Sequence, residues 1–429
     1  MKKIKMLLYQ ITALFAAFAF ALPAAAASVD LDAVYPISTN EIPGWPAGPE
    51  ISSDTGILME AQTKTVLYDK GADELRYPAS ITKLMTLLLA VENSSLTDTV
   101  TFTETGVRDV TPDSGNIGMQ LGETMTMEDC LYAMHIYSAN EVAAQVAEYV
   151  GGTEQNFIDM MNQRAAEIGC TNTHFANASG LPDPDQYTTA RDMALIFREG
   201  LKNDTFRKII GTQTYYIEPT NLNSETRKVH THHPLFAKES ALHYEGCLGG
   251  KSGMTNDAGY TLVTGVRQNG VTYIAVVMRG ADMSQVSTDS RLLFDYGLGN
   301  FQKTEYRNGN VILPAGTEES TLTMREEEID GRNMEVYYLS DHPVGIGKAV
   351  QATAAPTPEP QAEETEDADQ APLFGEAENS DITQEPAREG ITSLAKFLFI
   401  VMGVMALILV ILLIALGKKK HRKNKRKKK

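Results

Sequence analysis

The feature that most constrains the fold is the stretch SITKLMTLLLAVE at residues 80–92, which is apolar at nearly every position after its first turn. Such a pattern predicts a helix that is surrounded by protein on nearly all sides. Lys83 interrupts the pattern three residues after Ser80, and residues at this spacing share one helical face. Burial of an ammonium group is costly and lowers its pKa. An alternative is that the lysine stem packs along the helix while its ammonium group reaches water.

A serine with a lysine one helical turn away can form a nucleophile and its base. The serine hydroxyl is a weak nucleophile until a base removes its proton, and a desolvated lysine can be that base near neutral pH. Ser-x-x-Lys alone does not identify such a site, because the pattern recurs at residues 393–396. Two further patterns follow in order, Ser-x-Asn at residues 138–140 and Lys-Ser-Gly at residues 251–253. Another Ser-x-Asn at residues 38–40 precedes the first pattern, so order and context carry the specificity.

Both ends of the chain carry sequence patterns typical of secretion or membrane insertion. Residues 1–27 combine a basic start, an apolar run and an alanine-rich end, which predicts a cleaved secretory signal peptide, with an uncleaved anchor as the alternative. Residues 397–416 are 20 uncharged and mainly apolar residues, enough for a transmembrane helix. The basic residues 418–429 are interpreted as a stop-transfer signal that leaves this tail in the cytoplasm. We therefore expect a single-pass protein of the cell membrane, with the lipid bilayer as a partner and residues 28–396 outside the cell.

Residues 351–390 differ in composition from the rest of the chain, because they are rich in proline and in acidic residues. Low hydrophobicity with high charge predicts a disordered linker. The chain has a net charge of −17 although both of its ends are basic, so the part between them is strongly acidic. This charge argues against nucleic acid as a partner.

The rest of the chain is predicted to be α+β, with a catalytic domain at residues 28–300 whose compact part begins near residue 48. Strand patterns near both ends of this region favour one antiparallel sheet, with helices from the middle of the chain. The second pair of strands is joined by the hairpin signal Asn-Gly. Residues 301–350 are expected to form a small β appendage. The predicted strands are residues 56–61, 65–68, 260–266 and 271–278, and the predicted helices are residues 80–92, 127–150, 155–168 and 287–298.

Four segments resemble the serine D-alanyl-D-alanine carboxypeptidases, the low-molecular-mass penicillin-binding proteins, and they lie between about residues 50 and 300. The segments are YPASITKLMT at 77–86, NTHFANASGLP at 172–182, YTTARDM at 187–193 and KSGMTNDAGY at 251–260. The three short patterns in this order are also the motif set of penicillin-binding proteins and class A β-lactamases. The resemblance implies the serine β-lactamase/penicillin-binding-protein fold, a peptidoglycan stem peptide ending in D-Ala-D-Ala as substrate, and inhibition by β-lactam antibiotics.

The resemblance also implies a role for each motif residue. Ser80 would attack the carbonyl group between the two D-alanines, Lys83 would take its proton, and Ser138 would relay that proton to the leaving amine. Backbone N–H groups of Ser80 and Met254 would form the oxyanion hole. The other residues expected to bind substrate are Asn140 along its backbone, Lys251, Ser252 and Thr255 at its terminal carboxylate, and Gly253, which lets the strand come close. No metal or cofactor is expected.

Several features leave alternatives open. Ser252 replaces the usual threonine of the third motif, and a modest effect is expected because a hydroxyl remains. His230, His232 and His233 replace an Asn-Thr-Asn-like stretch of the family and allow a metal site as an alternative. A β-lactamase would need a glutamate for deacylation, and Glu218 is superficially suitable. An endopeptidase that cuts D-Ala cross-links uses the same acyl-enzyme chemistry, and a non-catalytic wall-binding protein could keep the same fold.

The chain has three cysteines, and their spacing suggests neither a metal site nor a disulfide framework. They are expected to be mainly buried free thiols, with a single disulfide as the alternative. Two further histidines, His135 and His174, are expected to be structural. The three cysteines are Cys130, Cys170 and Cys247.

Overall fold

The computed structural model describes residues 29–349, apart from residues 112, 113 and 330. Within the described residues, no helix is both long enough and apolar enough to cross a membrane. Four sequence predictions lie outside the described residues and stay predictions. They are the signal peptide (1–27), the linker (351–390), the transmembrane helix (397–416) and the basic tail (418–429).

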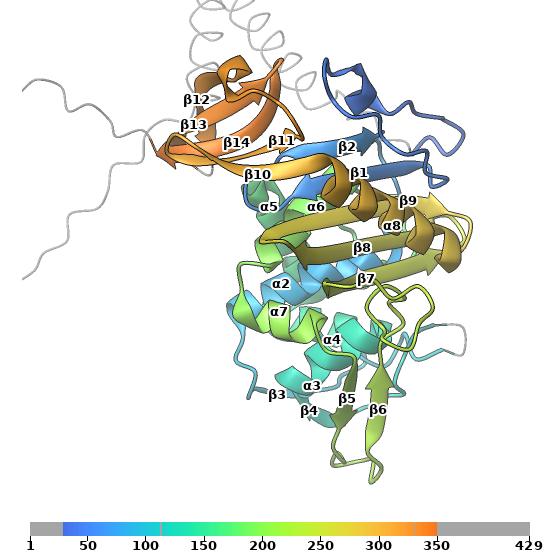
Figure 1. Ribbon diagram of the computed structural model, residues 1–429. Coiled ribbons are helices and arrows are strands. Elements are labelled where there is room, and N and C mark those ends of the chain that lie inside the picture. Colours follow the sequence, from blue (N-terminus) through green and yellow to red (C-terminus); the bar gives the residue numbers. More distant parts are fainter. Residues whose placement is uncertain (1–28, 112–113, 330, 350–429) are drawn as a thin grey trace, which may run out of the picture. The chain divides into compact units, whose positions relative to one another are not determined.

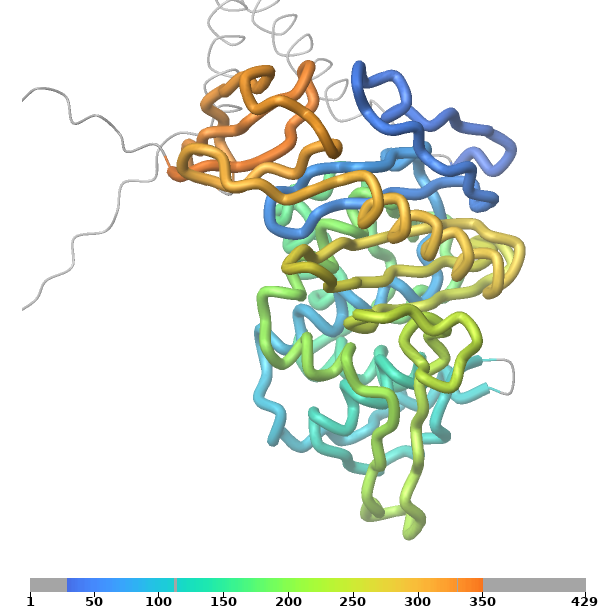
Figure 2. The backbone as a smooth tube through the Cα atoms, viewed as in Figure 1, coloured from blue at the N-terminus to red at the C-terminus, as the bar shows by residue number. Residues whose placement is uncertain are grey.

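A five-stranded antiparallel sheet forms the centre of the fold. Its strands are β1 (Thr55–Glu60), β2 (Val66–Lys70), β7 (Cys247–Thr255), β8 (Gly259–Gln268) and β9 (Val271–Gly280). Their order is β2-β1-β9-β8-β7, so strands from the two ends of the domain meet at the β1–β9 pair, where Ile57 lies opposite Val276 (Figure 1). The same meeting of early and late segments is visible in the backbone tube of Figure 2. The predicted sheet from both ends of the domain is confirmed.

The turn between β8 and β9 lies at the predicted Asn-Gly. Both Asn269 and Gly270 have a positive φ, 50° and 76°. Two consecutive residues in this region are typical of the tight turn whose twist matches an antiparallel hairpin. The Asn-Gly pattern therefore predicted the turn correctly, because the two residues readily adopt the positive φ that this turn requires.

Side chains of the sheet alternate between two hydrophobic cores, as the period of two residues in a strand requires. In β1, Ile57 and Met59 face the first core and Leu58 faces the second; in β9, Val276 faces the first core and Val277 the second. The first core lies between the sheet and the helices from the middle of the chain, and the second lies between the sheet, the last helix and the C-terminal strands. A strand that is buried on both sides is apolar on both faces along its middle, as residues 57–59 and 274–278 are.

Helix α2 (Lys83–Asn93) passes through the first core, and every residue from Lys83 to Ala90 is buried. It packs against α4, α5 and α6, so the prediction of a helix surrounded by protein is confirmed. Helices α6 and α7 were not predicted, although Thr189 and Asn203 cap their first turns by accepting backbone N–H groups. The other helices are α3 (Met127–Tyr132), α4 (Asn140–Gly151), α5 (Glu154–Ile168), α6 (Ala190–Gly200), α7 (Asp204–Ile210) and α8 (Met283–Asn300).

The predicted helix at residues 127–150 is interrupted at Ser138. Helix α3 runs into a π-helical turn, η3 (Ala133–Tyr137), and Ser138 then adopts a left-handed φ of 66° before α4 begins. The backbone N–H of Asn140 donates to the Gly115 carbonyl group at 2.7 Å, a partner outside any helix. The apolar pattern continues across the break, so periodicity could not reveal it. Such π-helical turns are frequent at functional sites.

Two small sheets extend the helical part of the domain, β3 (Thr99–Thr101) with β4 (Thr124–Thr126) and β5 (Thr214–Ile217) with β6 (Arg227–His230). The β5-β6 hairpin is tied to the residues before β4 by a buried ion pair, with 2.6 Å between Arg227 and the fully buried Glu123. The Thr220 hydroxyl donates to the same carboxylate oxygen at 2.6 Å. These strands were not predicted, because three or four residues carry too little pattern.

The predicted β appendage at residues 301–350 is a second five-stranded antiparallel sheet in the order β10-β11-β14-β13-β12. A short helical turn, η4 (Glu319–Thr321), precedes β12. The appendage shares the second core with the central sheet and α8. Its strands are β10 (Phe301–Tyr306), β11 (Gly309–Pro314), β12 (Thr323–Ile329), β13 (Arg332–Leu339) and β14 (His342–Ala349).

The N-terminal segment, with its helical turn η1 (Ser38–Glu41), joins this core through Trp45. The Trp45 ring lies 5.0 Å from the Phe301 ring and 4.8 Å from the His342 ring, measured between centroids. Its indole N–H donates to the Leu67 carbonyl group at 2.9 Å. The expectation that the compact part begins near residue 48 is therefore wrong, because the buried Trp45 precedes that position.

Candidate active site

Ser80 lies in a sharp turn directly before helix α2. The turn is η2 (Ala79–Thr82), and Ala79 has a left-handed φ of 51°, which is uncommon for a residue with a side chain. Gly180 touches this turn with a φ of 86°, and a Cβ there would overlap the Ala79 carbonyl group. The α-helix thus begins at Lys83, three residues later than the sequence suggests. Ser80 lies one turn ahead of it, at the end of the helix that meets the sheet.

Lys83 is fully buried, and its ammonium nitrogen has three oxygen partners. Nζ lies 3.0 Å from Ser80 Oγ, 2.5 Å from Asn140 Oδ1 and 2.6 Å from the Ser179 carbonyl oxygen. The alternative in which the ammonium group reaches water is therefore wrong. The three partners come from η2, from the start of α4 and from the loop before Gly180, so three separate parts of the chain assemble the site.

The surroundings of Lys83 favour its neutral form. Burial lowers the pKa of Lys83 well below its usual 10.5, and the positive charge of Lys251 lowers it further. Glu141 and Asp109 act on this pKa in the opposite direction. Of the three oxygen partners, only the Ser80 hydroxyl carries a proton to give. The geometry therefore places an amine that can accept a proton beside a hydroxyl that can give one, at the Ser-x-x-Lys spacing.

Ser138 and Asn140 lie on the two sides of the break between η3 and α4. Asn140 Oδ1 accepts from Lys83, and its Nδ2 donates to Ser114 Oγ at 2.7 Å. Ser138 is half-buried and lines the same cleft as Ser80. The left-handed turn at Ser138 thus brings the second motif to the nucleophile.

The third motif lies on β7, at the edge of the sheet beside Ser80. A Cβ at Gly253 would lie 2.7 Å from the Ser80 nitrogen, so glycine lets β7 pass this close. Lys251 is buried, its Nζ donates to the Ser252 carbonyl group at 2.9 Å, and burial lowers its pKa to about 7. Thr255 accepts a hydrogen bond from a backbone N–H of the turn that follows β7.

A cleft of about 460 Å³ runs along β7, within the size range of ligand sites in proteins. Lys83 lies beneath it in contact with Ser80, and no carboxylate of the described residues lines it. The structure therefore brings together all the residues that the sequence singled out. Those that line the cleft are Ser80, Ser138, Asn140, Lys251, Ser252, Gly253, Met254 and Thr255.

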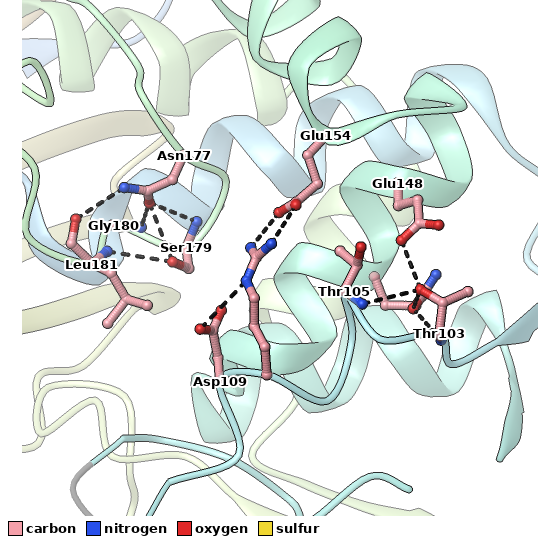
Figure 3. Close-up of polar contacts among 11 residues, drawn as sticks. Thr103, Thr105, Asp109, Glu148, Glu154, Asn177, Ser179, Gly180 and Leu181 are labelled. Carbon is pink, nitrogen blue, oxygen red and sulfur yellow. Dashed lines mark hydrogen bonds and ion pairs between the residues drawn. The ribbon is translucent and has the colours of Figure 1, made fainter. Parts of the chain in front are cut away.

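The loop that provides the third partner of Lys83 was not singled out as part of the site. Asn177 Oδ1 accepts from the backbone N–H groups of Ser179 and Gly180 at 3.2 and 2.7 Å (Figure 3). Its Nδ2 donates to the Leu181 carbonyl group at 3.0 Å. These bonds hold the loop in the shape that points the Ser179 carbonyl oxygen at Lys83. The resemblance of residues 172–182 to the family was a signal that could have found Ser179.

Glu141 is a second residue that the sequence analysis missed. It is fully buried, and one carboxylate oxygen accepts from the Ile117 N–H at 2.7 Å. Its other oxygen has no hydrogen-bond partner among the described residues. Burial raises the pKa of Glu141 to about 7, while backbone hydrogen bonds and the nearby charge of Lys83 oppose this rise. No sequence signal distinguished it from a solvent-facing glutamate of an amphipathic helix.

The three histidines at residues 230–233 have three different surroundings. His230 contacts Thr214 and Glu239. His232 lies at the cleft, and His233 is buried against β8, where burial lowers its pKa to about 4. Among the residues with described positions, no group of three histidine, cysteine or acidic side chains could hold a metal ion.

The structure also shows the surroundings of the cysteines, of Glu218 and of two further histidines, which the sequence analysis discussed. All three cysteines are free thiols, two of them buried, so the disulfide alternative is wrong. Glu218 is exposed beyond the end of β5 and does not line the cleft, which removes the observation that allowed a β-lactamase. His135 is buried at the cleft, where burial and the charge of Lys251 lower its pKa to about 3. His174 donates to the Asp185 carbonyl group through Nδ1–H.

Curated relatives share the sequence of this region at moderate identity. The chain is 30% identical to the D-alanyl-D-alanine carboxypeptidase DacF of Bacillus subtilis over 253 residues, which is 58% of this chain and 62% of that protein. It is 28% identical to the D-alanyl-D-alanine carboxypeptidase DacA of Haemophilus influenzae over 310 residues, 71% of this chain and 74% of that protein. The match thus spans less than two thirds of the Bacillus protein.

Solved structures share the fold. Penicillin-binding protein 5 of Haemophilus influenzae is 25% identical, with a TM-score of 0.59, and the similarity covers 71% of this chain and all of that one. The DD-transpeptidase of Streptomyces K15 is 26% identical, with a TM-score of 0.55, over 59% of this chain and all of that one. These neighbours confirm the penicillin-binding-protein fold of the described residues.

The family of this chain follows from a family model whose match covers the central sheet, the helical part and all three motifs. The model of the D-alanyl-D-alanine carboxypeptidase family, peptidase family S11, matches residues 43–282, more than half of the chain. The motifs lie in that range and meet in one cleft around a buried lysine. The chain belongs to the D-alanyl-D-alanine carboxypeptidase family.

Proposed function

We propose that this protein is a serine D-alanyl-D-alanine carboxypeptidase that removes the terminal D-alanine from peptidoglycan stem peptides. The observation that carries the proposal is the buried Lys83 nitrogen at 3.0 Å from Ser80 Oγ, in a cleft with the other two motifs. Family membership and the names of the relatives support the substrate class.

In the proposed first step, Ser80 forms an acyl-enzyme. Lys83 accepts the hydroxyl proton as Oγ bonds to the carbonyl carbon between the two D-alanines. Backbone N–H groups of Ser80 and Met254 stabilise the negative charge on the carbonyl oxygen. The carbon–nitrogen bond then breaks, and Ser138 passes a proton from Lys83 to the leaving amine, because a hydroxyl can donate and accept at once. Free D-alanine leaves.

In the proposed second step, water releases the shortened peptide. A water molecule gives a proton to Lys83 and attacks the ester carbon, and the Ser80–carbonyl bond breaks as Ser80 regains a proton. A β-lactam would form the same ester with Ser80 and would remain attached, because its leaving group stays tethered to the acyl group. This makes the protein a target of penicillin.

The terminal carboxylate of the substrate is assigned to the part of β7 at Lys251 and Ser252. Lys251 is the only lysine or arginine among the described residues that line the cleft, and Ser252 adds a hydroxyl there. Burial lowers the pKa of Lys251 to about 7 in the free protein. A bound carboxylate favours the protonated lysine, so binding and protonation are coupled.

We also propose that the protein is attached to the cell membrane, with its catalytic domain on the cell-wall side. Support comes from the uncharged residues 397–416, the basic residues 418–429 after them, and the acidic proline-rich residues 351–390 before them. Recovery of the protein in the membrane fraction, and its release when residues 397–429 are deleted, would test this placement.

The activity is tested by labelling and by product release. The purified protein and its Ser80→Ala variant are incubated with fluorescent penicillin, and the labelled residue is found by mass spectrometry. D-alanine release is followed with diacetyl-Lys-D-Ala-D-Ala. We expect stable labelling at Ser80, D-alanine release by the wild type, and neither in the variant. Labelling without release would favour the endopeptidase alternative, and no labelling at Ser80 would overturn the mechanism.

A further inference from the structure

A second hollow lies at the end of the central sheet where β1 ends and β9 begins. Its volume is about 430 Å³, and among the described residues it shares no lining residue with the catalytic cleft. Leu248 lines the hollow and Ser252 lines the cleft, and both belong to β7, so the two sites lie roughly 13 Å apart along that strand. The catalytic mechanism therefore does not account for this hollow.

Four cationic side chains line the hollow, and no carboxylate of the described residues does. They are Arg198 of α6, Lys202 just after α6, Arg207 of α7 and Arg267 of β8, and we call the site the basic hollow. The chain as a whole has the opposite charge, −17. A hollow lined by one sign of charge focuses the electric field and concentrates ions of the other sign. The basic hollow therefore attracts anions to a protein that otherwise repels them.

Backbone carbonyl groups orient two of the arginines. Arg198 Nε donates to the Ala61 carbonyl group at 2.6 Å, and Arg207 Nη1 donates to the Leu201 carbonyl group at 2.5 Å. These bonds limit the positions that the two guanidinium groups can take. Groups that are already oriented lose less freedom when a ligand binds, which favours binding.

Nearby carboxylates balance only part of the positive charge. Lys202 Nζ lies 2.5 Å from a Glu199 oxygen, and Arg207 pairs with the exposed Asp204. Arg267 is exposed, and its guanidinium group has no ion pair among the residues that the structure describes. Ion pairs at the surface contribute little, so an anion in the hollow can compete with them. The hollow thus keeps a surplus of positive charge.

The chemistry of the lining indicates a phosphate ester. The planar guanidinium group of arginine matches two oxygens of a phosphate group at once. Leu201 and Leu248 add carbon surface, against which the organic part of an ester can pack. The volume also lies within the range of sites that bind small organic ligands. The hollow thus has a place for the charge of such a ligand and another for its carbon atoms.

We propose that the basic hollow binds the phosphate group of a small phosphate ester. Two sources share this chemistry, a soluble ester and the headgroup of an anionic phospholipid. The site is separate from the cleft that holds the peptide, so ligand binding there does not need Ser80. Arg207 and Arg267 are assigned as the main phosphate contacts.

Binding to the full chain, in a nonionic detergent, is measured by isothermal titration calorimetry. The probes are sn-glycerol 3-phosphate, the short-chain lipid dihexanoylphosphatidylglycerol, and glycerol, which lacks the phosphate group. We expect both phosphate compounds to bind and glycerol not to bind. In the double variant Arg207→Gln, Arg267→Gln the Kd rises about tenfold or more, because charge-assisted hydrogen bonds are lost. Added sodium chloride also weakens binding to the wild type, because it screens charges near the surface.

The double variant Lys228→Gln, Arg332→Gln is the matched control. It removes the same charge at two exposed positions that do not line the hollow, so it should keep the wild-type Kd. A wild-type midpoint of urea unfolding shows that the hollow variant is folded. If that variant is misfolded, the single variant Arg267→Gln, at an exposed position near the end of β8, carries the test.

The outcomes also identify the source of the phosphate. Binding that the hollow variant loses and the control variant keeps supports the site, with the soluble ester as ligand if it binds more tightly and the headgroup if the lipid does. Absence of binding by both phosphate compounds, or the same loss in both double variants, would overturn the proposal. Penicillin labelling of Ser80 is measured separately, so neither result bears on the carboxypeptidase activity.

Discussion

At the residue scale, the site depends on one lysine that is held where water cannot solvate it. Lys83 is fully buried and has only oxygen partners, one of which is the Ser80 hydroxyl. Burial would be unfavourable for the charged form without these partners, and it lowers the pKa of the group. The burial that makes the charged lysine costly therefore also suits Lys83 to its proposed role as the base.

Replacement of Lys83 by arginine keeps the charge and removes the base. A guanidinium group stays protonated at every accessible pH, so it cannot accept the Ser80 proton. We expect Lys83→Arg to lower the second-order rate of penicillin acylation about 10²- to 10⁴-fold, the range typical of a general base. Lys208→Arg, at an exposed lysine paired with Glu128, is the matched control and should keep the wild-type rate. An active Lys83→Arg variant would show that another group is the base.

The pH dependence separates the two lysines of the cleft. The proposed acylation uses neutral Lys83, and burial favours this form because it lowers the pKa of the group. Carboxylate binding requires protonated Lys251, and burial lowers its pKa to about 7. We therefore expect kcat/KM to fall as pH rises above about 7 and expect Lys251→Arg, which stays charged, to move this decline to higher pH. A pH profile of D-alanine release that is identical in both proteins would contradict this assignment.

At the element scale, strain is concentrated where the motifs meet. Ala79 precedes the nucleophile with a φ of 51°, and Ser138 begins the second motif with a φ of 66°. Left-handed conformations cost residues with a Cβ about 1–2 kcal/mol relative to glycine. The turn at Ala79 begins η2 and the turn at Ser138 follows the end of η3, which lets the side chains that follow reach the cleft from two directions. The fold thus accepts local strain in order to bring Ser80 and Asn140 to the same lysine.

A glycine at position 138 should separate this strain from the chemistry. Ser138→Gly removes both the hydroxyl and the strain, while Ser138→Ala removes the hydroxyl alone. We expect both variants to lose acylation rate, and we expect Ser138→Gly to be more stable than Ser138→Ala by about 1 kcal/mol. Denaturant unfolding of the two variants measures the difference. Equal stability would show that the turn at Ser138 is not strained.

How much of this arrangement is predictable depends on whether its causes are local. The spacing of Ser80 and Lys83 and the Asn-Gly turn follow from residues that are neighbours in sequence, and the structure confirms them. The break at Ser138 is not visible in the apolar pattern, which continues across it. What satisfies the backbone N–H of Asn140 after the break is the Gly115 carbonyl group, more than 20 residues earlier. The contact of Ser179 with Lys83 spans 96 residues. Periodicity and motif spacing do not show such long-range contacts, and only the resemblance of residues 172–182 to the family pointed to the segment that contains Ser179.

At the scale of the whole molecule, the two cores connect parts that the sequence analysis treated as separate. The second core contains residues of the N-terminal segment, the central sheet, α8 and the β appendage. Trp45, in the N-terminal segment, contacts the central sheet through Leu67 and the β appendage through Phe301 and His342. We therefore expect the catalytic domain and the appendage to unfold as one cooperative unit.

Trp45 is the single tryptophan of the chain, so its fluorescence reports on this junction. In urea, the change in tryptophan emission and the loss of penicillin labelling at Ser80 should have the same midpoint, since one reports on the second core and the other on the first. Trp45→Phe should lower the midpoint and keep the labelling rate in the absence of urea. An emission change that precedes the loss of labelling would show that the appendage unfolds independently.

The pairing of β1 with β9 also determines when the protein can become active during its synthesis. Strand β1 is made early, yet its partner on one side, β9, begins only at Val271. For most of its synthesis, the growing chain therefore carries an apolar strand whose edge is unpaired. Such unpaired edges promote aggregation. Pairing between distant segments is also slow, because a long loop has to close first. The nascent chain consequently needs protection from aggregation until β9, the last strand of the central sheet, has been made. Reactivity of Ser80 toward penicillin then marks the moment at which folding is complete.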